Sequence, residues 1–140
     1  MLQKLVQSML VVLVLSIFAA TPVMAATQSY KFYYYEDTNT NGTLNVGDIC
    51  RRGTTLQLGK ELIVGTYQTW FWGYVPIAGS NFTITNFAQL NSCKTSSSST
   101  YSVEVGKKYR LKDQAGIYSD FTPAGGSLQY FGLIGGNENF

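Results

Sequence analysis

The chain has 140 residues, ten of them basic and eight acidic, and contains no histidine. A net charge of +2 at pH 7 is too small for nucleic acid or an anionic membrane to be attracted by charge alone. Without histidine, the usual catalytic base, the common triads and most catalytic zinc sites are excluded, and the acidic residues form no evident facing pair for glycoside hydrolysis. We therefore expect a protein that is not an enzyme.

Residues 1–25 have the pattern of a secretory signal peptide. Lys4 precedes the apolar run MLVVLVLSIFAA, and the small-residue segment TPVMA ends at Ala25. The apolar run is shorter than the roughly 20 residues that cross a bilayer, so we expect cleavage rather than a retained anchor. Residues 26–140 are then predicted to form a single secreted domain without a membrane span.

The two cysteines, Cys50 and Cys93, both lie in the part predicted to be exported. Disulfides persist outside the cell, and two cysteines allow one pairing. A reactive thiol is the weaker alternative because no histidine is present to activate a thiolate. A Cys50–Cys93 disulfide is therefore predicted, and in the chain-entropy model it stabilises the fold by on the order of 4 kcal/mol.

The alternation of side chains and the spacing of turn residues predict an all-β fold. In the first strand, Tyr30, Phe32 and Tyr34 share one face, whereas Tyr33 and Tyr35 lie on the other. Seven or eight strands in a domain of this size favour a two-sheet β-sandwich, Ig-like or prealbumin-like, over a barrel. The predicted strands are 29–36, 54–58, 61–66, 67–75, 81–87, 101–105, 107–112 and 127–135.

Two segments in the second half of the chain are predicted to be at the surface. The run TSSSST, residues 95–100, has no large apolar side chain and predicts a flexible loop. The strands on either side of Gly106 predict a hairpin, with Lys108, Arg110 and Lys112 facing water. A solvated strand face that discourages edge pairing explains this basic row more simply than a ligand site does.

The segment EDTNTNGTLNVGD, residues 36–48, nearly matches the D-x-[DN]-x-[DN]-G pattern of a calcium-binding loop. Oxygen-bearing side chains at every second position favour a calcium loop over a plain polar turn, and Gly42 permits the sharp bend. Only two carboxylates are available, which predicts a modest affinity of about 10⁻⁴ to 10⁻³ M. The candidate ligands are Asp37, Asn39, Asn41, the carbonyl of Thr43, Asn45 and Asp48.

The stretch FYYYEDTNTNGTLNVGD resembles the opening of the serine-aspartate-repeat B-like domains of the Cna-B (prealbumin-like) superfamily, where a first strand runs into a calcium loop. VEVGKKYRLK is similar to a late hairpin of that superfamily, and LQYFGLIG to its closing strand. The resemblance implies a rigid spacer or display module of surface proteins, stiffened by calcium. We expect a secreted structural or adhesive module that contacts extracellular matrix, a surface protein or polysaccharide.

Two other functions remain open. The stretch TWFWGY places Trp70, Trp72 and Tyr74 on one strand face, as a carbohydrate-binding module would, although core packing is the commoner role of such residues. Alternatively, the chain could be a subunit of an extracellular fibre that self-associates by strand addition through its aromatic first strand.

Overall fold

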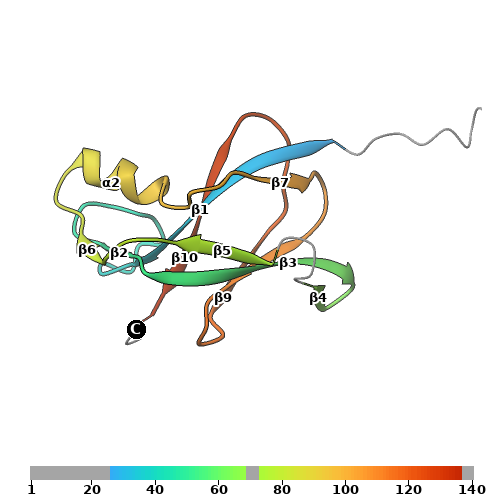
Figure 1. Cartoon of the computed structure of the whole chain (residues 1–140), viewed down its shortest axis with the longest axis horizontal. Helices are drawn as coiled ribbons and strands as arrows, with labels where there is room; N and C mark the ends of the chain where they lie inside the picture. The colour runs from blue at the N-terminus through green and yellow to red at the C-terminus, as the bar shows by residue number, and fades with distance from the viewer. Residues whose placement is uncertain (1–25, 69–72, 137–140) are drawn as a thin grey trace, which may run out of the picture.

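The computed structural model describes residues 26–68 and 73–136 as two packed β-sheets with one short helix (Figure 1). Sheet A contains β1 (Thr27–Glu36), β2 (Ile49–Arg51), β6 (Phe82–Thr83), β7 (Tyr101–Glu104) and β10 (Gln129–Gly135). Sheet B contains β3 (Thr54–Ile63), β4 (Thr66–Gln68), β5 (Tyr74–Ile77), β8 (Tyr109–Lys112) and β9 (Tyr118–Phe121). The helix is α2 (Phe87–Lys94). The predicted all-β sandwich is confirmed.

Strand order places β1 inside its sheet. Sheet A runs β10-β1-β2-β6, with β7 also paired to β1, and sheet B runs β4-β3-β8-β9, with β5 also paired to β3. β10 lies parallel to β1, whereas β2 and β7 are antiparallel to it. β1 is therefore hydrogen-bonded on both sides within its own sheet. None of the described helices is long and apolar enough to cross a membrane.

The main core lies between the two sheets and follows the predicted alternation of β1. Tyr30, Phe32 and Tyr34 point into it, and Phe121 of β9 packs its ring against Tyr30 and Phe32 with ring centroids 4.9 and 5.7 Å away. Burial of these aromatic rings and their partners is the main force that holds the sheets together. The remaining buried members are Leu56, Leu58, Val75, Ile77, Val103, Tyr109, Leu111 and Leu133.

A second, smaller core covers the outer face of sheet A. Tyr33 and Tyr35 stack there with ring centroids 5.6 Å apart, beneath Leu44 of the 36–48 loop and beside α2. Cys50, Ile84 and Cys93 complete this core. Because β1 is buried on both faces, an unbroken run of aromatic residues occupies a strand in which alternation with polar residues would otherwise be expected.

The predicted strand 81–87 is wrong in its second half. β6 ends at Thr83, and α2 begins at Phe87. Asn86 caps the helix, since its side chain accepts a hydrogen bond from Gln89 N at 2.9 Å. The Gln89 side chain in turn accepts from Thr85 N at 2.6 Å. This exchange resembles a capping box, and the spacing N-x-x-Q was its signal in the sequence.

The predicted hairpin 101–112 is wrong. β7 pairs with β1 in sheet A, whereas β8 pairs with β3 and β9 in sheet B, so Gly106 lies in a crossover between the sheets. Because β8 lies inside sheet B, the basic row of Lys108, Arg110 and Lys112 does not protect a sheet edge. β9 was not predicted at all.

Three further local features differ from the predictions. β3 continues without a break through Gly59 and Lys60, so the predicted strands 54–58 and 61–66 share one strand as far as Ile63. β5 contains Pro76, which is tolerated because, among the described residues, the side of β5 away from β3 makes only an isolated bridge from Ile77 to Ser97 and needs no donor at Pro76. The serine-rich run is anchored, since buried Ser97 accepts a hydrogen bond from Phe32 N at 2.9 Å.

Candidate metal centre

The 36–48 loop connects two strands whose ends already lie side by side. Glu36 of β1 pairs with Ile49 of β2, so the loop closes on itself over the outer face of sheet A. Leu44, only 7 % exposed, packs into the second core with Tyr33 and Tyr35. The loop is thus fixed at its base by strand pairing and near its middle by an apolar anchor.

Asp37 holds the turn of the loop through one carboxylate oxygen. Gly42 N donates to Asp37 Oδ2 at 2.6 Å, and Gly42 has a φ of 79°, which glycine adopts without strain. The other oxygen, Asp37 Oδ1, is buried and has no hydrogen-bond partner. A buried carboxylate oxygen without a partner is costly, so this atom is the strongest sign that the loop takes a further ligand.

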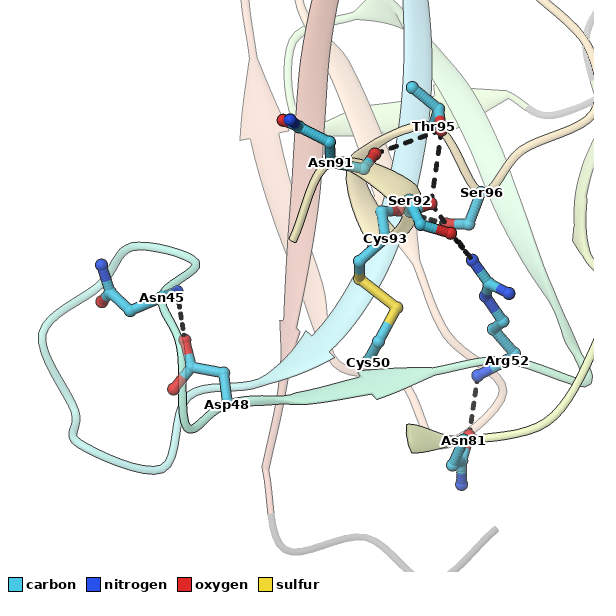
Figure 2. Close-up of a disulfide and its surroundings, with 10 residues drawn as sticks. All are labelled: Asn45, Asp48, Cys50, Arg52, Asn81, Asn91, Ser92, Cys93, Thr95 and Ser96. Atoms are coloured by element: carbon cyan, nitrogen blue, oxygen red, sulfur yellow. Dashed lines mark hydrogen bonds between the residues drawn. A yellow bond between two sulfur atoms is a disulfide. The ribbon is translucent and has the colours of Figure 1, made fainter. Parts of the chain in front are cut away.

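Asp48 organises the base of the loop and is completely buried. Its Oδ1 accepts from the backbone N–H and the hydroxyl of Thr38, both at 3.1 Å. Its Oδ2 accepts from Asn45 N at 2.8 Å, the hydrogen bond drawn in Figure 2. Thr38 was not among the predicted site residues. Its hydroxyl shares its single proton between Asp48 Oδ1 and Gly47 O, 2.9 Å away, which ties the start of the loop to its end.

Asn41, Thr43 and Asn45 form a connected polar group on the exposed side of the loop. Thr43 N donates to Asn41 Oδ1 at 3.1 Å, and the Thr43 hydroxyl donates to Asn45 Oδ1 at 3.2 Å. The Asn41 amide also donates to Asn45 Oδ1. Asn39 lies exposed, outside the hydrogen bonds described for the loop. Hydrogen bonds therefore link Asn41, Thr43, Asn45 and Asp48, whereas Asp37 is bonded to Gly42 N. Thr43 takes part through its hydroxyl and N–H, not through the carbonyl that was predicted as a ligand.

The field in the loop is negative. The pKa of Tyr35 is raised, first because the ring is buried, then by Tyr33 and by the carboxylates of Asp37 and Asp48.

No cluster of three or more His, Cys, Asp or Glu side chains occurs among the described residues. Any cation in the loop would thus combine two carboxylates with amide, hydroxyl and carbonyl oxygens, a donor set that suits Ca²⁺ better than a transition metal.

The predicted disulfide is present. Cys50 of β2 and Cys93 of α2 are bonded, with their Cα atoms 5.8 Å apart, and Figure 2 shows the bond joining the helix to the strand that follows the loop. Nearby, Arg52 donates to Ser92 O at 3.1 Å. The disulfide and the loop therefore fix two neighbouring parts of the cover over sheet A.

A groove of about 470 Å³ runs beside the loop along β10. Its lining includes Tyr33, Tyr35, Leu44 and Gly132. The Tyr33 ring lies flat on Gly132, where a Cβ atom would come within 2.3 Å of the ring. Gly132 therefore allows the second core to close against β10.

The predicted aromatic platform is only partly described. Trp70 and Trp72 lie outside the described residues. Tyr74 is 65 % exposed on the outward face of sheet B, whereas the 36–48 loop belongs to sheet A. The Tyr74 carbonyl accepts a hydrogen bond from the Tyr101 hydroxyl at 2.9 Å.

One buried polar pair was missed by the sequence analysis. The Tyr34 hydroxyl donates to Asp113 Oδ2 at 2.6 Å, and both side chains are buried. Asp113 Oδ1 also accepts from Ile117 N at 2.8 Å, which closes the turn between β8 and β9. The pattern D-x-x-G at residues 113–116 signals this turn, but the contact with Tyr34 could not be read from it.

Comparisons with protein-family models, with curated proteins and with solved structures found no match. The resemblance to the Cna-B superfamily therefore rests on the sequence motifs and stays a prediction.

Proposed function

We propose that the protein is a secreted, calcium-stabilised β-sandwich that serves as a structural or adhesive module outside the cell. The observation that carries this proposal is the Asp37 carboxylate, with one oxygen held by Gly42 N and the other buried without a partner. A cation at this oxygen would supply the missing interaction. Asp48 provides the second negative charge at the base of the same loop.

Calcium binding would act on stability through the cover of sheet A. The loop contributes Leu44 to the second core, and Cys50 in the same core is joined to α2 by the disulfide. A cation that fixes the loop would therefore also fix Leu44 over Tyr33 and Tyr35. Such stiffening, together with export and a disulfide, supports a rigid extracellular module rather than a catalyst.

Thermal unfolding in calcium and in chelator tests the proposal. At 10 mM calcium, a dissociation constant of 10⁻⁴ to 10⁻³ M gives about 1.4 to 2.7 kcal/mol of stabilisation, which raises the midpoint by roughly 5 to 10 °C in a domain of this size. Asp37→Asn should remove the shift, because the amide keeps an acceptor for Gly42 N but loses the charge. Glu61→Gln, a matched loss of one carboxylate on sheet B, should keep it. An unchanged midpoint in the wild type contradicts the proposal.

A further inference from the structure

The outward face of sheet B carries an aligned row of aromatic and polar side chains. In the strand registers, Tyr74 pairs with Gln57, Gln57 with Lys112, and Lys112 with Tyr118. Directly paired residues point to the same face of a sheet, and their neighbours Leu56, Leu58, Val75 and Leu111 point into the core. The row thus crosses β5, β3, β8 and β9 on the solvent side, with Tyr74 65 % and Tyr118 52 % exposed.

Next to this row, an ordered cluster fixes the position of the rings. The Arg110 guanidinium lies between the rings of Tyr67 and Tyr118, 4.0 and 3.7 Å from their centroids. Asp120 accepts from Arg110 Nε at 2.8 Å and from a terminal nitrogen at 3.1 Å. Because Arg110 is held on three sides, Tyr118 is oriented before any ligand arrives, which lowers the entropy cost of binding.

Three basic residues, Lys108, Arg110 and Lys112, outnumber two acidic residues, Asp120 and Glu61, on this face. Asp120 is shared by Arg110 and by Lys108, whose Nζ lies 4.0 Å from it. No carboxylate of the described residues lies within salt-bridge distance of Lys112, which stands between Gln57 and Tyr118 in the row. Since β8 is an interior strand, protection of a sheet edge does not account for these bases.

We infer that the outward face of sheet B binds an acidic polysaccharide, a polyuronate, across the row from Tyr74 to Tyr118. Tyr74 and the face of the Tyr118 ring opposite Arg110 would stack against the C–H faces of sugar rings. The Lys112 ammonium would pair with a sugar carboxylate, and the Gln57 amide would accept hydrogen bonds from hydroxyls and donate to them. The two tyrosines are three strand spacings apart, about 14 Å, so the row suits an oligosaccharide rather than a single sugar. A small pocket of about 40 Å³ lies beside the row and is lined by Gln57, Gly59, Tyr67, Arg110 and Lys112.

This inference is independent of the calcium proposal, since the loop lies on sheet A. It also differs from the platform predicted from Trp70, Trp72 and Tyr74, because only Tyr74 is shared. The spread of the row over about 14 Å and the Lys112 ammonium within it, which has no carboxylate partner among the described residues, fit an extended, negatively charged sugar polymer.

Affinity electrophoresis in native gels tests the inference with polygalacturonate as the probe and neutral dextran as the comparison. Chelator is included because calcium crosslinks polygalacturonate. The wild type should be retarded by polygalacturonate and not by dextran. Lys112→Gln should weaken binding by about tenfold, as expected for the loss of a hydrogen bond to a charged group. Tyr118→Ala should also weaken binding, whereas Tyr118→Phe, which keeps the ring, should retain it.

Lys94→Gln is the matched control, since Lys94 lies on α2 over sheet A. It should change binding by less than about twofold, the modest effect expected for a distant, partly exposed charge. Unfolding midpoints of all variants separate lost binding from lost folding. The inference is overturned if the wild type is not retarded, if Lys94→Gln and Lys112→Gln weaken binding equally, or if dextran retards the protein as strongly. Concentration-dependent self-association lost in Tyr118→Ala would assign the face to a second copy and overturn it as well.

Discussion

Replacement of Asp48 by Asn should destabilise the metal-free protein by about 3 kcal/mol. The buried carboxylate accepts three hydrogen bonds, two from Thr38 at Oδ1 and one from Asn45 N at Oδ2. An amide of the same shape has one oxygen, so its NH₂ group must face at least one N–H or O–H donor. Hydrogen bonds to a charged group contribute roughly 1.5 to 3 kcal/mol each, and relaxation of the exposed part of the loop recovers some of the loss.

A loss of this size is a large part of the 5 to 15 kcal/mol that typically stabilises a domain. Urea unfolding followed by circular dichroism in chelator measures it directly. Asp37→Asn provides the contrast, because its amide oxygen can still accept from Gly42 N and a buried charge is removed; it should stay within about 1 kcal/mol of the wild type. The reasoning is refuted if Asp48→Asn falls within about 0.5 kcal/mol of the wild type, or if both variants lose the same stability.

Three further changes test other parts of the fold. Tyr34→Phe should cost about 1 to 3 kcal/mol by leaving the Asp113 carboxylate short of a donor, and denaturant unfolding at pH 7 measures it; a cost below 0.5 kcal/mol would contradict this. Replacing both Cys50 and Cys93 by Ala should lower the free energy of unfolding by on the order of 4 kcal/mol relative to the oxidised wild type. Reductant should lower the unfolding midpoint of the wild type and leave that of the variant unchanged. The pKa of Asp120 is lowered, first by its hydrogen bond to a guanidinium, so its contribution is present above the pKa of the unfolded state and is lost as pH falls through the lower folded pKa. Asp120→Asn should flatten that acid loss by less than about 1 kcal/mol, since the pair is at the surface, and a steeper loss would count against it.

Local patterns were sufficient where the outcome depends on neighbours in the chain. The period of two in β1 assigned Tyr30 and Phe32 to one face and Tyr33 to the other, and the structure covers each face with a core. The predicted export and the cysteine count together predicted the disulfide. The position of Gly42 predicted a sharp bend in the loop, and Gly42 has a φ of 79° there.

Contacts between distant segments were not predictable in this way. Residues 101–112 alternate like a hairpin, yet packing places β7 and β8 in different sheets, which local periodicity does not encode. Thr83 and Ile84 favour a strand on their own, and this preference hid the cap at Asn86. Tyr34 and Asp113 are 79 residues apart, so their hydrogen bond depends on the complete fold.

Titration of the metal-free protein with calcium in an isothermal calorimeter tests the central claim most directly. The account predicts one site per chain with a dissociation constant of about 10⁻⁴ to 10⁻³ M. The heat should disappear in Asp37→Asn and persist in Lys112→Gln, because Lys112 lies on the other sheet. No heat beyond dilution in the wild type, or an unchanged binding curve in Asp37→Asn, would contradict the assignment of the 36–48 loop as a calcium site.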